Sequence, residues 1–202
     1  MFEIHTFYKI IVALGIIMVS ILYIIYKLLT SKNPIFIRRS VVNYSSKKVP
    51  DQIINDAIKA AISAPNHFLS EPWRFYLCGK KVKNEIINLN PSKKDVFLEV
   101  PYWMVVTMKS KHAMYEKLHF EDYAACACAC QNFMVYLASK GIGSKWVTGA
   151  LGIKETEILR TVSCGLGEKF IGIIWFGYPT KNLLDIQAPT RNIGMGVLKY
   201  LD

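Results

Sequence analysis

The stretch EDYAACACACQNFMVYLASKGIGSKWVTG, residues 121–149, decides the fold class of this chain. Residues 121–140 predict the strongest helix of the C-terminal region, and Gly141 is the residue at which we expect it to stop. Residues 141–149 carry several glycines, which let backbone amides approach a flat or charged ligand closely. Small side chains along the helix allow a second helix to pack against it: Ala124, Ala125, Ala127 and Ala129.

The same helix carries three of the five cysteines of the chain, Cys126, Cys128 and Cys130. Helical spacing places Cys126 and Cys130 on one face and Cys128 on another. Two thiolates alone make a poor metal site, whereas free cysteine packs well as a small apolar residue. We therefore expect packing and no metal site here. An odd cysteine count without a CxxC pair also argues against a secreted disulfide framework.

Further helices and strands are expected on both sides of this stretch. A helix with one apolar stripe begins after Pro50 and stops at residues 64–65, and a polar-faced helix covers residues 80–89. Strands are expected at residues 73–78, 102–108 and 170–177. Because helices and strands mix along the chain, the fold class is an α+β layered domain.

The N-terminal segment is uncharged and mostly aliphatic over residues 10–26, and Leu28 and Leu29 extend it past Lys27. A bilayer core needs about 20 helical residues, so a transmembrane helix is expected at about residues 10–29. A cleaved signal peptide and a buried core helix are the alternatives. The expected organisation is a membrane anchor in residues 1–30, a linker in residues 31–36 and a folded domain in residues 37–202.

Charge flanking this segment predicts an orientation. Glu3 and Lys9 precede it, whereas Lys27, Lys32, Arg38 and Arg39 follow it. The positive-inside rule then predicts a single-pass membrane protein whose C-terminal domain faces the cytosol. The formal net charge of +10 favours anionic partners in general. The lysines are scattered without interleaved aromatics, so we expect no binding of nucleic acid.

Four segments together carry the candidate chemistry, and the last of them runs from Phe170-Ile171-Gly172 through Gly177-Tyr178-Pro179. Arg38, Arg39 and Ser40 offer guanidinium forks and a hydroxyl, which suit a phosphate, although a membrane-proximal basic pair would look the same. His67 lies in the proline-bounded loop APNH, before EPWRF, and can donate to an anionic or carbonyl-bearing ligand or serve a structural role. The glycine-rich residues 141–149 match neither a Walker loop nor GxGxxG, which argues against an ATP or Rossmann dinucleotide site.

The order of these motifs resembles that of the nitroreductase family of FMN-dependent enzymes. The chain presents RRS at residues 38–40, then APNH and EPWRF, then a small-residue helix with QN, then GIGSKW.TGAL and IGIIWFGYP. The resemblance covers residues 37–179 and is strongest to the small NAD(P)H nitroreductases whose loop reads APDH. It implies a layered α/β sandwich with a central mixed or antiparallel sheet.

The resemblance also implies an activity. Such an enzyme is a homodimer with FMN at the subunit interface, and it transfers a hydride from NAD(P)H through the flavin to a nitro, quinone or similar flat acceptor. The flavin carries the chemistry, so no catalytic side chain and no metal is expected.

The resemblance assigns cofactor contacts to particular residues. Arg38, Arg39 and Ser40 match the segment that binds the FMN phosphate and ribityl chain. His67 matches the loop residue that reaches FMN from the other subunit, and Ser63 stands where relatives carry a second contact, often arginine. The residues beside the flavin ring would be Trp146, Val147 and Thr148.

Two alternatives remain open from the sequence. One is a reductive dehalogenase resembling iodotyrosine deiodinase, which joins a membrane anchor to this fold and closes its site with a lid bearing Glu, Tyr and Lys. Residues 115–117 supply these types, but the stretch from Lys109 to Glu121 is short for such a lid, so we interpret the match as a coincidence. The other is a non-enzymatic flavin-fold binding module. It is favoured by Ser63 and by Val42, which stands where larger family members place a basic residue near the flavin.

Overall fold

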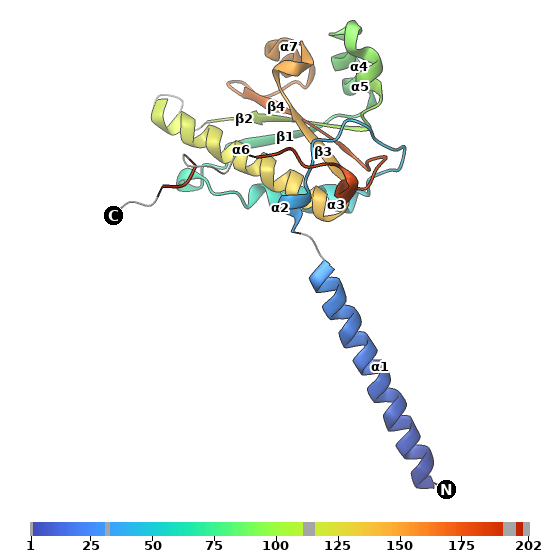
Figure 1. The fold of residues 1–202 in the computed structure, drawn as a ribbon. Helices are drawn as coiled ribbons and strands as arrows, with labels where there is room; N and C mark the ends of the chain where they lie inside the picture. Colours follow the sequence, from blue (N-terminus) through green and yellow to red (C-terminus); the bar gives the residue numbers. More distant parts are fainter. Residues whose placement is uncertain (1, 31–32, 111–115, 192–196, 200–202) are drawn as a thin grey trace. The chain divides into compact units, whose positions relative to one another are not determined.

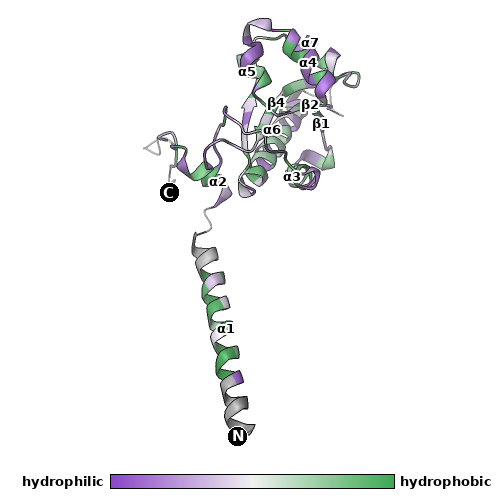
Figure 2. Cartoon of the chain, turned by 90° about the vertical axis from the view of Figure 1, so that its right-hand side faces the viewer, coloured by the Kyte–Doolittle hydropathy of each residue, from purple (hydrophilic) through white to green (hydrophobic). Residues whose placement is uncertain are grey.

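The computed structural model describes residues 2–30, 33–110, 116–191 and 197–199. The chain divides into two compact units, Met1–Phe36 and Ile37–Asp202, and each is described by itself. The first unit consists mainly of the helix α1, Phe2–Thr30. Its described residues are predominantly hydrophobic, as the colouring of Figure 2 shows, and most of them are exposed. A short helix α2, Pro34–Ile37, overlaps the end of the range expected as a linker, residues 31–36.

The predicted transmembrane segment at residues 10–29 requires correction. Within the part of the chain that the structure describes, no helix is both long enough and apolar enough to cross a membrane. This finding contradicts three predictions: the membrane anchor, the single-pass location, and the cytosolic orientation inferred from flanking charge.

The second unit is built on a four-stranded antiparallel sheet with strand order β1-β2-β4-β3 (Figure 1). The strands are β1 Trp73–Leu77, β2 Tyr102–Met108, β3 Gly143–Val147 and β4 Lys169–Gly177. All three pairs of neighbouring strands run antiparallel. The expected strands at residues 73–78, 102–108 and 170–177 are therefore confirmed within a residue, and the sheet is antiparallel.

Two helices, α3 Asp51–Ile62 and α6 Glu116–Ser139, cover one face of the sheet (Figure 1). Ala57 and Ala61 of α3 and Ala129 of α6 are completely buried, so small side chains allow close packing of the helices. Of the other small residues named for this packing, Ala125 is buried, Ala127 is partly buried and Ala124 is exposed. Alternate residues of β2, including Met104 and Val106, face the same core because side chains of a strand alternate between faces.

The cysteines of α6 are positioned as their spacing predicts. Cys126 and Cys130 are buried in the core, and Cys128 is exposed. Burial raises the pKa of the Cys126 thiol to about 12 and that of Cys130 further. Both thiols are therefore protonated near neutral pH and act as apolar packing groups.

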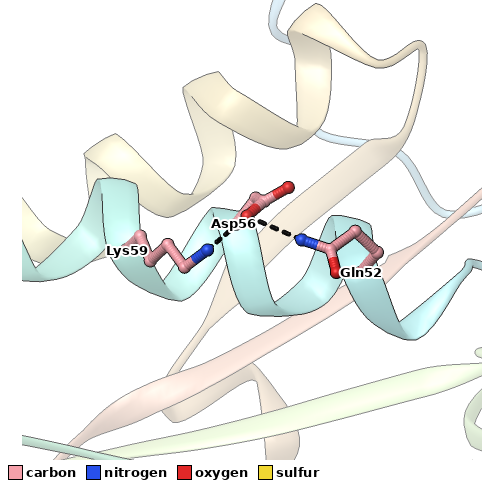
Figure 3. Close-up of polar contacts among 3 residues, drawn as sticks. All are labelled: Gln52, Asp56 and Lys59. Carbon is pink, nitrogen blue, oxygen red and sulfur yellow. Dashed lines mark hydrogen bonds and ion pairs between the residues drawn. The ribbon is translucent and has the colours of Figure 1, made fainter.

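The outer side of α3 is polar (Figure 3). The Asp56 carboxylate accepts a hydrogen bond of 3.0 Å from the Gln52 side chain and one of 2.9 Å from Lys59 Nζ. These bonds lower the pKa of Asp56, with the bond from Lys59 as the larger cause. The contact involves partly or largely exposed groups, so we expect little contribution to stability.

Three shorter helices cover the opposite face of the sheet: α4 Lys80–Asn88, α5 Lys94–Leu98 and α7 Glu155–Thr161 (Figure 1). The core on this side is aromatic. Phe97 packs edge to face against Trp103 and Trp175, with ring centroids 5.3 and 5.7 Å apart. Four 3₁₀ turns complete the described unit: η1 His67–Leu69, η2 Pro91–Lys93, η3 Gly149–Leu151 and η4 Leu183–Asp185.

One strand was missed by sequence reasoning. Residues 143–147 form β3, although their glycines indicated a ligand-binding loop. The glycine has a packing role: a Cβ at Gly143 would lie 2.5 Å from Cγ2 of Val41. Gly143 therefore allows the chain around residues 40–41 to lie directly against β3.

Candidate functional site

The arginine segment lies along the outer strand β3. Ser40 forms a parallel bridge with Ser144, and the Val41 amide donates a 3.1 Å hydrogen bond to the Ser144 carbonyl. The fold thus joins two of the motifs singled out in the sequence, although about a hundred residues separate them. The Ser144 hydroxyl is buried and has no hydrogen-bond partner within the described residues.

A third arginine, Arg191, completes this group and was not identified from the sequence. Burial lowers the pKa of Arg38 most, and the neighbouring positive charges of Arg39 and Arg191 lower it further. Arg39 helps to hold the C-terminal segment nearby, because its Nε donates to the Ile186 carbonyl at 3.2 Å. No sequence pattern marked Arg191, because the segment between the last strand and this residue has no hydrophobic periodicity. We call Arg38, Arg39 and Arg191 the arginine cluster.

The charges of the arginine cluster favour an anion. Among the residues that the structure describes, no carboxylate forms an ion pair with Arg38 or Arg191. Like charges held close together repel one another, and a phosphate would offset that repulsion while accepting hydrogen bonds from the guanidinium groups. The cluster therefore fits the phosphate of FMN.

The His67 loop is the second part of the candidate site. His67 Nδ1 lies 3.0 Å from Glu121 Oε2 near the start of α6. The next two residues, Phe68 and Leu69, have left-handed backbone conformations with φ of 46° and 51°, which cost energy for bulky side chains. The side-chain amide of Asn66 stabilises the loop by accepting a 3.0 Å hydrogen bond from the Glu71 amide.

A buried carboxylate ties the same loop to α6. Asp122 is fully buried, and its two oxygens accept hydrogen bonds from the hydroxyls of Ser70 at 2.7 Å and Ser110 at 2.6 Å. Ser70 ends the loop and Ser110 follows β2. Asp122 therefore joins three segments of the chain at one point.

Replacing Asp122 by alanine should lower the free energy of unfolding by about 2–4 kcal/mol, because both buried hydrogen bonds are lost. Urea unfolding measures the change, and Asp122→Asn, which keeps one acceptor oxygen, should lose less. Asp56→Ala, on the polar side of α3, is the matched control and should leave the unfolding midpoint nearly unchanged. Equal effects of Asp122→Ala and Asp56→Ala would contradict this role.

The remaining predicted residues lie in different surroundings. Ser63 is exposed at the end of α3, and its hydroxyl donates to the Ala60 carbonyl at 2.7 Å. Val147 is buried, so any contact that it makes with a ligand must come from its backbone. Trp146 is half-buried, with its indole donating to the Ile171 carbonyl at 3.3 Å, whereas Thr148 is exposed.

The predicted contacts fall into two separate groups within one chain. His67 adjoins Glu121 near the start of α6, whereas the arginine segment adjoins β3, which follows the end of the helix at Ser139. At 1.5 Å per residue, the helix between Glu121 and Ser139 is about 27 Å long. The two groups also adjoin opposite edges of the sheet, since His67 precedes β1. A single chain therefore does not bring them together.

The chain belongs to the nitroreductase family, whose model matches residues 35–118 and 82–178. It is 30% identical over 159 residues to YfhC of Bacillus subtilis, which is provisionally named an NAD(P)H nitroreductase. This alignment covers 70% of this chain and 80% of that protein. It is 25% identical over 175 residues to iodotyrosine deiodinase of Hydra vulgaris, covering 72% and 63% of the two chains. The family resemblance expected from the sequence is confirmed.

Solved structures agree on the fold. A nitroreductase-like family protein from Bacillus cereus superposes with a TM-score of 0.72 at 25% identity, covering 84% of this chain and 95% of that one. A nitroreductase-type protein from Desulfovibrio desulfuricans, solved in complex with FMN, has a TM-score of 0.67 at 20% identity, with coverages of 79% and 90%. The lid residues considered for the dehalogenase alternative, 115–117, lie outside the residues whose side chains are described.

Proposed function

We propose that this protein is an FMN-dependent oxidoreductase that transfers a hydride from NAD(P)H to a nitro, quinone or similar flat acceptor. The observation that carries the proposal is the arginine segment, which lies along β3 through the Ser40–Ser144 bridge and in which the positive charges of Arg39 and Arg191 act on Arg38, in a member of the nitroreductase family. The relatives support the same chemistry, since YfhC is named an NAD(P)H nitroreductase and the Desulfovibrio desulfuricans protein was solved in complex with FMN. The flavin-binding domain would be residues 37–202.

The chain's own residues position the cofactor. Arg38, Arg39 and Arg191 bind its phosphate, and the Ser40 hydroxyl, which is on an exposed residue, adds a donor. The backbone of Trp146 and Val147 in the outer strand, with Thr148 directly after it, forms the wall for the ring, because the Val147 side chain is committed to the core. When bound, FMN supplies the hydride chemistry. The role of the protein is therefore to bind and orient the cofactor and to exclude water from it.

We propose further that the site is completed by a second copy of the chain, with His67 contributed across the interface. About 27 Å of helix separates His67 from the arginine segment within one chain, which favours contribution from a partner. Phe68 and Leu69 are 84% and 77% exposed despite their strained backbone. Large apolar side chains presented in this way are typical of residues that bury in a protein interface. Ser63 lies four residues before His67 and would approach the cofactor from the same side.

A visible spectrum of the purified full chain tests the function directly. We expect a yellow protein with bound FMN that bleaches when NADH or NADPH is added without oxygen, and recovers its colour when a quinone or nitroaromatic compound is added. Failure to bind FMN on reconstitution would contradict the oxidoreductase and support a binding module. Robust dehalogenation of halotyrosines by the reduced protein would instead favour the deiodinase-like reaction.

A further inference from the structure

A cavity of about 460 Å³ in the second unit is lined by four lysines, Lys47, Lys48, Lys80 and Lys83. We call it the lysine pocket. In the sequence these lysines looked scattered, in the manner of a solvated surface. The rest of the lining includes the half-buried thiol of Cys78 and is otherwise partly polar and partly apolar. Ser46, Asn84 and the Tyr102 side chain are polar, and Leu98 and Pro101 are apolar. None of the residues of the arginine cluster lines this pocket.

The fold brings the lysines together from two distant segments. The Tyr102 hydroxyl accepts a 3.1 Å hydrogen bond from the Val49 amide, which ties the segment carrying Lys47 and Lys48 to the start of β2. Lys80 and Lys83 lie three residues apart in the first turn of α4, so they share one side of the helix. The convergence therefore depends on the tertiary structure.

The positive charges of the pocket are not balanced locally. Within the described parts of the chain, none of the four lysines forms an ion pair with a carboxylate. Lys83 Nζ donates to the Val100 carbonyl, and Lys47 Nζ lies 4.2 Å from the centre of the Tyr178 ring. Burial lowers the pKa of Lys83, because desolvation disfavours its charged form.

The start of α4 adds to this imbalance. Its first turn contains no acidic residue and carries Lys80, Lys81 and Lys83. Negative charge is favoured at a helix N-terminus and positive charge is disfavoured, because the amide groups there carry partial positive charge. An anion bound in the lysine pocket would relieve both the repulsion among the lysines and the unfavourable helix end.

We propose that the lysine pocket binds a phosphorylated small molecule that carries two or more phosphate charges. Lysine ammonium groups bind phosphate oxygens as flexible point charges, and four of them suit a diphosphate or triphosphate. A volume of about 460 Å³ lies in the range of small-molecule sites. Leu98 and Pro101 supply an apolar wall for the organic part of the ligand. The proposal does not depend on the oxidoreductase function.

Titration calorimetry on the full chain, saturated beforehand with FMN, tests the proposal with inorganic pyrophosphate and with ATP as probes. We expect saturable binding of at least one probe at one molecule per chain. Lys80→Gln should weaken that binding about tenfold, and Lys48→Gln combined with Lys80→Gln about 100-fold. Lys81→Gln is the matched control, since Lys81 neighbours Lys80 on the same helix but does not line the pocket, and it should change affinity less than about twofold.

Three results would overturn the proposal. The first is the absence of saturable binding of both probes at millimolar concentration. The second is an equal loss of affinity in Lys80→Gln and Lys81→Gln, which would indicate diffuse attraction to a basic surface. The third is binding that appears only when FMN is left out and that is lost in Arg38→Ala, which would place the anion at the arginine cluster.

Discussion

Replacing Arg38 by alanine is expected to weaken FMN binding by about 10- to 100-fold. Each hydrogen bond between a guanidinium and a phosphate contributes about 1.5–3 kcal/mol, and about 1.4 kcal/mol corresponds to a factor of ten. Arg38 is half-buried, so water replaces the lost contact poorly. Arg38→Lys should recover only part of the affinity, because an ammonium lacks the two-pronged geometry of the guanidinium. Quenching of flavin fluorescence on titration with FMN measures the dissociation constant.

The matched control for this experiment is Arg160→Ala, which removes an exposed arginine from α7. It should leave FMN affinity unchanged while altering net charge equally. Arg191→Ala should behave like Arg38→Ala, because both guanidinium groups belong to the arginine cluster. Unchanged FMN affinity in both cluster variants, with unfolding midpoints equal to that of the original chain, would show that the phosphate binds elsewhere.

Replacing Gly172 by alanine is expected to lower the free energy of unfolding by about 2–4 kcal/mol. Gly172 lies in β4 with φ of 153°, beside an irregularity in its pairing with β2. A Cβ there would lie 2.1 Å from Nε1 of Trp146 and 3.1 Å from the carbonyl oxygen of Val147. The indole would have to move, and its hydrogen bond to the Ile171 carbonyl would be lost. Urea unfolding followed by tryptophan fluorescence measures the effect.

A second substitution separates steric conflict from backbone strain. Trp146→Phe shortens the ring, so the double variant with Gly172→Ala should recover part of the lost stability, although the Val147 carbonyl remains close. Gly79→Ala is the control, because nothing lies within 4 Å of its added Cβ and its φ is −68°. Additive losses in the double variant would contradict direct contact between the residue at 172 and the indole.

Regular elements were the features most readily predicted from the sequence. The run of apolar residues at 102–108 forms β2 with the expected bounds, and the helix expected at residues 121–140 forms the main part of α6. Both predictions depend on hydrophobic periodicity, and the whole of that pattern lies within one continuous segment of the chain. The membrane anchor was predicted from hydrophobicity and length alone, and among the described residues no helix is both long enough and apolar enough to cross a membrane.

Features that depend on several segments were the ones that the sequence analysis missed. Arg191 has no local pattern that connects it to Arg38, and the four lysines of the lysine pocket looked like a solvated surface. Residues 143–147 were expected as a loop because glycines are common in ligand-binding turns. Here Gly143 instead makes space for Val41, a contact that can be recognised only when both segments are placed.

The sequence by itself determined the α+β class, the packing of Cys126 and Cys130, and membership of the nitroreductase family through motifs in a characteristic order. Only the tertiary structure decided which cations gather into clusters and that His67 and the arginine segment lie at different ends of α6. The physical reason is range. Hydrophobic periodicity acts over a few neighbouring residues, whereas the charge of a site is the sum over residues that meet only after the chain has folded.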